Sequence, residues 1–209
     1  DPPAVHAIRV EIKKMSALFH LINYAVRDFK RKKTFKPFNV IFRKAGKLRE
    51  LQVEEAMLKK YAIKSLPSDY RKGLKKQRLQ EQREFSTIMS SKFAAHLKEN
   101  CHKLYSFVSK ADKNKVYRYL KWKRKKIERL VAKSTLQTPE LHKLRKQIKE
   151  LEYNRTSVGM KSPKSRSVKA NALPILLGKW HDCQVIIRHL EKVTMDREKH
   201  PRELTQLKR

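Results

Sequence analysis

The sequence predicts an all-α protein, a helical bundle made of two similar halves. The composition is the first reason, because helix-favouring residues are plentiful and only 4 of the 209 residues are Gly. Periodicity is the second reason, since apolar residues recur at helical spacings and no strand pattern competes. A repeated pair of helix motifs is the third. Hydrophobic residues make up 39% of the chain, which is enough for a buried core.

The first predicted helix spans residues 4–33 and carries one apolar stripe at spacings of three and four residues. The stripe consists of Ile8, Ile12, Met15, Phe19, Ile22 and Val26. Prolines mark the predicted joints between helices, at Pro37, Pro67, Pro139, Pro163, Pro174 and Pro201. The following helices are expected near 38–62, 69–98, 102–110, 113–134, 138–156 and 171–195, with a short stub after Pro201.

Specific residues mark one helix start and one loop. Thr138, Pro139 and Glu140 are typical of a helix N-terminus, with a hydroxyl N-cap, a proline in the first position and an acid in the first turn. The stretch 157–170 is basic and lacks an apolar period. We therefore expect a flexible loop there.

The same motifs occur twice in the chain. VHAIR at 5–9 corresponds to LHKLR at 141–145, and GKLRELQV at 46–53 corresponds to GKWHDCQV at 178–185. This predicts two copies of a helix pair, related by a pseudo-two-fold axis, in halves of about 1–135 and about 138–209. Fewer residues follow GKWHDCQV than lie between GKLRELQV and the start of the second copy. The second half is therefore expected to be shortened.

The formal net charge of +33 predicts a polyanionic partner: nucleic acid, an anionic membrane or polyphosphate. No apolar run is long enough to cross a bilayer, and no signal-peptide pattern is present. The two cysteines, Cys101 and Cys183, lie far apart and form no metal-binding spacing. They favour the reducing cytoplasm over a disulfide scaffold.

The two first helices each carry a ladder of basic residues opposite the apolar stripe. His6, Arg9 and Lys13 share one face with His20, and the second copy repeats the ladder. Its members there are His142, Arg145 and Lys149. A solvated face usually mixes both signs of charge, whereas these positions hold bases only. The pattern therefore favours contact with a ligand over a plain solvated face.

The second helix of each pair places a basic residue on its inner face, Arg49 in the first copy and His181 in the second. A buried Arg needs an anionic partner, and either a salt bridge inside the bundle or contact with a bound anion would provide one. Gly46 and Gly178 lie in the middle of these helices, where Gly is unfavourable by ~1 kcal/mol. They indicate close packing of another helix or a backbone left open to a ligand.

These four segments resemble the CHAD family, the conserved histidine α-helical domain. The resemblance implies a pair of four-helix bundles around a basic central cavity that binds inorganic polyphosphate without catalysing a reaction. The residues that it places in the cavity are His6, Arg9, Lys13, Lys14, Arg49, His142, Arg145, Lys149 and His181, with His20, Arg43, Lys47 and Lys179 as secondary basic positions. Two residues depart from the pattern: Glu150 replaces a second Lys, and His181 stands where the first half has Arg49.

Two other functions stay open. The run VYRYLKWKRKKIERL at 116–130 interleaves aromatic and basic residues, which could bind RNA or DNA non-specifically, although an amphipathic helix with a solvated basic back explains it as well. The pair His181 and Asp182 resembles part of a metal-dependent phosphohydrolase site, but acids are scarce near every His.

We therefore expect one domain over residues 1–209 that binds inorganic polyphosphate, is not an enzyme, and needs no metal or cofactor. A cytoplasmic location follows from the thiols, and association with polyphosphate granules follows from the expected ligand. The sequence leaves the oligomeric state undetermined.

Overall fold

The computed structural model describes residues 2–60, 68–160 and 168–199. The helices within these ranges are α1 (Pro2–Ala25), α2 (Arg31–Lys60), α3 (Ser68–Ile88), α4 (Ser91–Val108), α5 (Lys113–Val131), α6 (Thr138–Ser157) and α7 (Val168–Lys199). The described ranges contain no strand. The all-α prediction is therefore confirmed.

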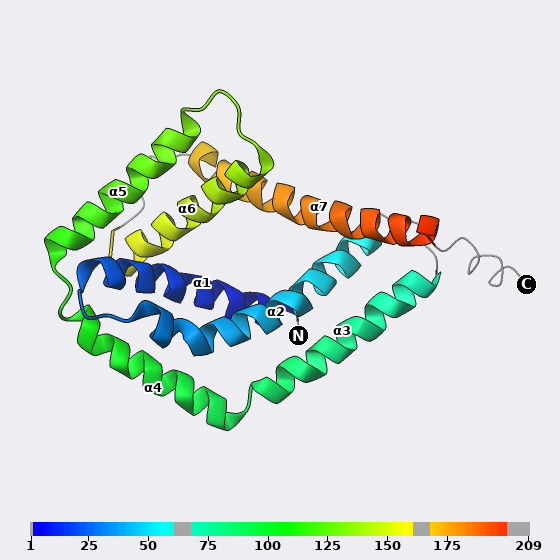
Figure 1. Cartoon of the computed structure of the whole chain (residues 1–209), viewed down its shortest axis with the longest axis horizontal. Helices are drawn as coiled ribbons and strands as arrows, with labels where there is room; N and C mark the ends of the chain where they lie inside the picture. The colour runs from blue at the N-terminus through cyan, green and yellow to red at the C-terminus, as the bar shows by residue number, and fades with distance from the viewer. Residues whose placement is uncertain (1, 61–67, 161–167, 200–209) are drawn as a thin grey trace, which may run out of the picture.

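The first helix, α1, is shared between two groups of helices (Figure 1). It packs against α2 on one side and against α5 and α6 on another. Helices α3 and α4 pack against α2, while α6 contacts both α5 and α7. The first helix pair, α1 and α2, thus meets the second pair, α6 and α7, through direct contacts of α1 with α6 and of α2 with α7.

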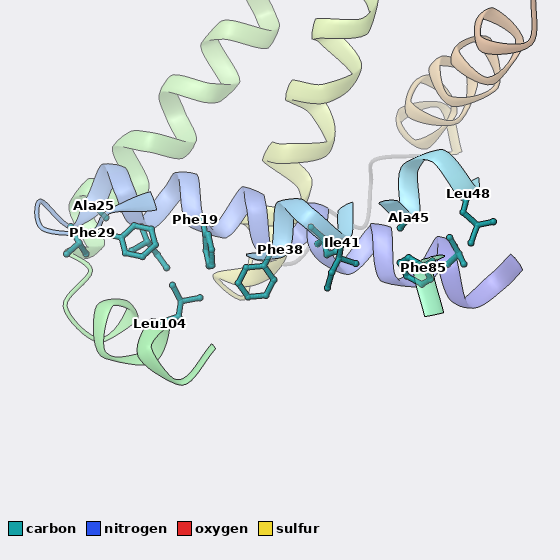
Figure 2. Packing of buried hydrophobic residues seen from close by; sticks show 13 residues of the cluster. Phe19, Ala25, Phe29, Phe38, Ile41, Ala45, Leu48, Phe85 and Leu104 are labelled. Atoms are coloured by element: carbon teal, nitrogen blue, oxygen red, sulfur yellow. The ribbon is translucent and has the colours of Figure 1, made fainter. Parts of the chain in front are cut away.

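An aromatic core holds α1 and α2 together. The ring of Phe19 is fully buried and meets Phe29, Phe35 and Phe38 edge to face, with ring centroids 5.6, 5.5 and 5.7 Å away. Such aromatic pairs are favourable beyond the area they bury. Figure 2 shows Phe85 of α3 and Leu104 of α4 in the same cluster. The predicted apolar stripe of the first helix belongs to this core throughout.

The predicted helix 4–33 is too long, because α1 ends at Ala25 and the chain turns before α2 begins at Arg31. Within the turn Phe29 is buried, and its ring contacts both Phe19 and Phe107 of α4. A continuous helix would carry Phe29 past this core. Tertiary packing has therefore overridden the helix propensity of the segment.

The predicted joint at Pro174 is wrong, because that residue lies inside α7. The predicted joint at Pro37 is also wrong, since Pro37 lies inside α2. A proline within a helix removes one backbone hydrogen bond and crowds the preceding turn. Here its neighbours Phe35 and Phe38 both pack on Phe19. We attribute the tolerance of α2 for Pro37 to this packing.

The predicted helix 69–98 is divided in two. α3 ends at Ile88, and α4 begins after Ser90, whose hydroxyl accepts a hydrogen bond from the backbone N–H of Phe93 at 3.3 Å. This is a regular serine N-cap. The break expected before 102–110 does not exist, because α4 continues to Val108.

A smaller apolar cluster joins α5, α6 and α7, with Leu130, Leu144 and Leu177 at its centre. The N-cap of α6 is Gln137 rather than the predicted Thr138, and the Glu140 carboxylate accepts a hydrogen bond from the Gln137 backbone N–H at 3.1 Å. The expected loop 157–170 is shorter than predicted, because α7 begins at Val168.

Several predictions fall outside the residues described. Residues 161–167 of the expected loop and the stub after Pro201 lie there. Both predicted helix pairs exist, as α1 with α2 and α6 with α7. The pseudo-two-fold relation between them and the shortening of the second half stay predictions.

One buried carboxylate ties α1, α5 and α6 together. Oε1 of Glu150 lies 2.9 Å from Nδ1 of His20, accepts a hydrogen bond from the Tyr119 hydroxyl at 2.7 Å, and pairs with Nζ of Lys123 at 2.8 Å. Burial acts to raise the pKa of Glu150, but these hydrogen bonds and the charge of Lys123 outweigh it and hold the pKa at about 2. The departure from the family pattern at this position therefore has a structural role.

We expect Glu150→Gln to lower the free energy of unfolding by about 1–3 kcal/mol at neutral pH, because it leaves Lys123 without its partner. A lowered carboxyl pKa stabilises the fold above the unfolded pKa, and this contribution is lost as the pH falls from about 4.5 towards about 2. Denaturant unfolding at a series of pH values measures both effects. The control is Glu152→Gln, which removes an exposed ion pair with Lys149 and should change stability by less than about 0.5 kcal/mol. Equal effects of the two changes would contradict the role of Glu150.

Candidate functional site

Basic side chains of α1 and α2 face one another. His6, Arg9 and Lys13 follow at spacings of three and four residues on α1, so they share the face away from the apolar core. Partial burial lowers the pKa of His6, and the charges of Arg49, Lys13 and Arg9 lower it further. These electrostatic interactions place Arg49 of α2 within the same group.

Arg9 lies against α2 in a position that Gly46 makes possible. Its Nη1 donates a hydrogen bond to the backbone carbonyl of Phe42 at 3.1 Å, and the guanidinium carbon lies 4.6 Å from the centroid of the Phe42 ring. A Cβ atom at position 46 would lie only 2.6 Å from that Nη1. Gly46 therefore leaves room for a guanidinium group rather than for a helix backbone.

The equivalent glycine in the second copy has no such role. A Cβ atom at position 178 would meet no atom within 4 Å among the described residues. One turn along, His181 of α7 contacts His142 of α6, with ring centroids 4.9 Å apart. The repeated phrase thus positions an arginine pair in the first half and a histidine pair in the second.

The two halves meet at Lys13. Burial lowers its pKa to about 8, and the charges of Arg9 on α1 and Arg145 on α6 contribute. Asp182 of α7 acts in the opposite direction on both Lys13 and His6. Four helices therefore contribute to one group of basic side chains, which we call the cationic cluster. Its members are His6, Arg9, Lys13, Arg49, His142, Arg145, His181 and Arg188.

The histidines of the cluster are neutral at neutral pH. Burial, the charge of Arg145 and the neighbouring His142 lower the pKa of His181 to about 4. The pKa of His142 is lowered by burial and by Lys146, Arg145 and Arg188. Both shifts have the direction expected where cations crowd together with too few acids.

Arg145 contributes a buried hydrogen-bond donor to the cationic cluster. Its Nε atom is buried and lacks a hydrogen-bond partner among the residues described. A buried donor without a partner is unfavourable by about 1–3 kcal/mol. An anion bound at the cluster would satisfy this donor and balance the surrounding charge.

The structure separates some predicted site residues from the cluster. Lys14 pairs with Glu11 at 2.7 Å and Lys149 pairs with Glu152 at 2.9 Å, and both line a cavity elsewhere in the molecule. Lys14 differs from Lys13 because adjacent residues point about 100° apart on a helix. Lys149 has the spacing of Lys13, but its amine pairs with Glu152 instead. Of the secondary positions, His20 contacts Glu150, Lys47 lies 3.8 Å from Glu81, and Arg43 and Lys179 are exposed.

Sequence reasoning missed Arg188. It lies two helical turns after His181, so it occupies the same face of α7. Its charge lowers the pKa of both histidines, and its Nε donates a hydrogen bond to the backbone carbonyl of Gln184 at 3.2 Å. The seven-residue spacing between His181 and Arg188 could have predicted that the two side chains share a face.

The family assignment rests on the match of the CHAD domain model to residues 1–191. The chain belongs to the CHAD domain family. CHAD domains are known for association with polyphosphate and are in general binding modules. No curated protein and no solved structure gave a significant match to this CHAD chain.

Within residues 2–60, 68–160 and 168–199, no three His, Cys, Asp or Glu side chains gather as they would around a metal ion. His181 and Asp182 therefore lack, in that part of the chain, the additional ligands of a two-metal site. None of the described helices is both long and apolar enough to span a bilayer.

We expect Gly46→Ala to weaken polyphosphate binding several-fold, because the new methyl group displaces the Arg9 guanidinium. Stability should change by less than about 1 kcal/mol, since alanine favours the helix. Gly178→Ala is the matched control: it gains the same helix propensity with no neighbour to displace, and polyphosphate affinity should stay unchanged. Calorimetric titration and thermal unfolding of both variants provide the comparison. Unchanged affinity in Gly46→Ala would show that the position of Arg9 is not part of the site.

Proposed function

We propose that the cationic cluster binds inorganic polyphosphate and that this chain acts as a binding module without chemistry of its own. The observation that carries the proposal is the crowding of basic side chains from four helices. Burial and like charges lower the pKa of Lys13, His142 and His181, so grouping these cations without a counter-charge is electrostatically unfavourable. A polyanion relieves this repulsion.

The side chains suit successive phosphates of one chain. Arginine offers a planar pair of donors that matches phosphate oxygens, and Arg9, Arg49 and Arg145 lie on three different helices. The buried Nε of Arg145 has a free hydrogen for such an oxygen. Because the cations extend from α1 and α2 to α6 and α7, a linear polyanion can contact more of them than a single phosphate can.

Asp182 limits which anions bind. It is the acid that acts on His6, Lys13 and His181 within the cluster, and it is exposed. A weakly charged anion gains little from the site while meeting this repulsion. A polyanion interacts with many cations at once, so the attraction outweighs the repulsion from Asp182 and from Glu50, which acts on Arg9.

Nucleic acid is the second candidate, and one observation on α5 favours it. The exposed ring of Trp122 stacks near Tyr24, with Nζ of Lys126 3.8 Å from the centroid of the indole ring. Exposed aromatic and basic side chains together bind single-stranded nucleic acids in many proteins. However, Tyr119 is buried and hydrogen-bonded to Glu150, and Lys123 is paired with the same carboxylate. Part of the aromatic and basic run therefore serves the fold.

The deciding experiment measures competition among long-chain polyphosphate, duplex DNA and single-stranded RNA over a salt series. Retention of polyphosphate at salt concentrations that release both nucleic acids supports the proposed function. Simultaneous release of all three ligands would instead indicate attraction by net charge alone, because such binding falls steeply and similarly with salt.

We expect the double change Arg9→Ala with Arg145→Ala to weaken polyphosphate binding at least tenfold, about 1.4 kcal/mol or more. The two guanidinium groups come from different halves of the cluster. Arg118→Ala with Arg129→Ala is the matched control, since it removes the same charge from exposed positions of α5, and it should weaken binding less than about threefold. Equal losses in the two double variants would rule out a shaped site. Circular dichroism confirms that both remain folded.

Binding should also become tighter as the pH falls from about 8 to about 5. The pKa values of His6, His142 and His181 are lowered in the free protein, and a bound polyanion raises them, so binding takes up protons. Affinity therefore rises as the pH drops through the raised pKa values. Calorimetry in buffers of different ionisation enthalpy measures this proton uptake directly.

His181→Gln should reduce that uptake and flatten the pH dependence. His102→Gln, which changes an exposed histidine of α4, should leave both unchanged. A wild-type affinity that is independent of pH across this range would show that the histidines do not contact the ligand.

A further inference from the structure

A cavity of about 840 Å³ lies between α5, α6 and the beginning of α7, apart from the cationic cluster. Its walls are mainly apolar, with Ile127 of α5, Ile148 and Leu151 of α6, and Pro174 and Ile175 of α7. None of the cluster residues lines it. The proposed function therefore leaves this cavity without a role.

Exposed apolar side chains also occur on α7 near the cavity. Leu173, Ile175 and Leu176 are 42%, 57% and 59% exposed, and of these only Ile175 lines the cavity, because Leu173 points about 160° away from it around the helix. Single exposed apolar residues are ordinary, but an apolar cavity with a largely exposed apolar side chain in its wall is typical of a binding surface. We call this cavity the α7 groove.

In the first half of the chain, helices cover the positions that correspond to Ile148 and Leu173. In the sequence repeat Ile148 corresponds to Ile12, and Leu173 corresponds to Ile41. Ile12 and Ile41 are only 5% and 2% exposed, because they belong to the core that α3 and α4 complete. Their counterparts are less covered, because Ile148 is half-buried beside the Leu130 cluster and Leu173 is 42% exposed.

The charged side chains at the rim of the cavity indicate which charge a binding partner would carry. Lys14, Arg124, Lys149 and Arg155 line the cavity together with two acids, Glu128 and Glu152. The acids form ion pairs within their own helices, Arg124 with Glu128 at 2.7 Å and Lys149 with Glu152 at 2.9 Å. Exposed pairs of this kind are worth less than about 1 kcal/mol, so an incoming carboxylate can replace them.

We propose that the α7 groove binds an amphipathic α-helix of another protein, with acidic residues on both flanks of its apolar stripe. The apolar side chains enter the cavity against Ile127, Ile148 and Ile175, and the acidic flanks meet the basic rim. This is the helix-in-groove mode of recognition. A second copy of this chain fits less well, because two molecules of net charge +33 repel each other.

The test uses the whole chain and a synthetic helical peptide of about 18 residues, or five turns, with Leu at positions i, i+3, i+4 and i+7 and Glu on both flanks. Fluorescence anisotropy at about 0.3 M salt, which screens non-specific attraction, measures binding. We expect a Kd on the order of 10 μM. A peptide of the same composition with the Leu and Glu positions scrambled, and one with Lys in place of Glu, should each bind at least tenfold more weakly.

Ile175→Asp should abolish binding of the acidic amphipathic peptide without unfolding the protein, because Ile175 is largely exposed. The matched control is Leu79→Asp, which adds the same charge at an exposed position of α3 and should leave peptide affinity unchanged. Polyphosphate affinity should be the same in both variants, so the result does not depend on the function of the cationic cluster.

Three outcomes would overturn the proposal. The first is equal binding of the scrambled acidic peptide, which would leave only bulk charge as the cause. The second is unchanged binding in Ile175→Asp, and the third is failure of the wild-type chain to bind the acidic helix. Sedimentation velocity adds a further check, because a dimer that Ile175→Asp dissociates would assign the groove to a second copy instead.

Discussion

The apolar stripe of α1 is buried against α2, and this burial determines where every other side chain of the helix points. With Ile12, Phe19 and Ile22 directed into the core, His6, Arg9 and Lys13 lie on another face of α1. There Arg9 contacts α2, and Lys13 interacts with charged residues of α6 and α7. The hydrophobic contribution is favourable enough to hold these cations near Arg145 and Arg49 despite their mutual repulsion. The cationic cluster is therefore a product of core packing, and no ion pair is needed to assemble it.

Sequence patterns predicted those features that depend on one helix at a time. The stripe of α1, the ladders with His6 and His142, and the two helix pairs follow from spacings of three and four residues, which a sequence displays directly. Contacts between helices could not be predicted from these patterns. The turn at Phe29 exists because its ring reaches Phe19 and Phe107, and neither partner is adjacent in the sequence.

The same limit explains the errors at the site. Lys149 repeats the spacing of Lys13, yet its amine pairs with Glu152 beside the cavity while Lys13 lies in the cluster. The equivalence of Gly46 and Gly178 likewise stops at the backbone, because only Gly46 has a guanidinium group above it. A repeat in sequence thus predicts helices in similar places and does not predict what their side chains meet.

Binding of an anion to the cationic cluster would link the lifetime of the folded protein to the supply of that anion. An anion that binds only the folded state stabilises it by RT ln(1 + [L]/Kd), about 2.7 kcal/mol when the ligand is at a hundredfold excess over Kd. Proteases in a cell degrade molecules during transient unfolding, so a stabilised protein is degraded more slowly. The amount of this protein would then rise and fall with the supply of the anion, without any change in its synthesis.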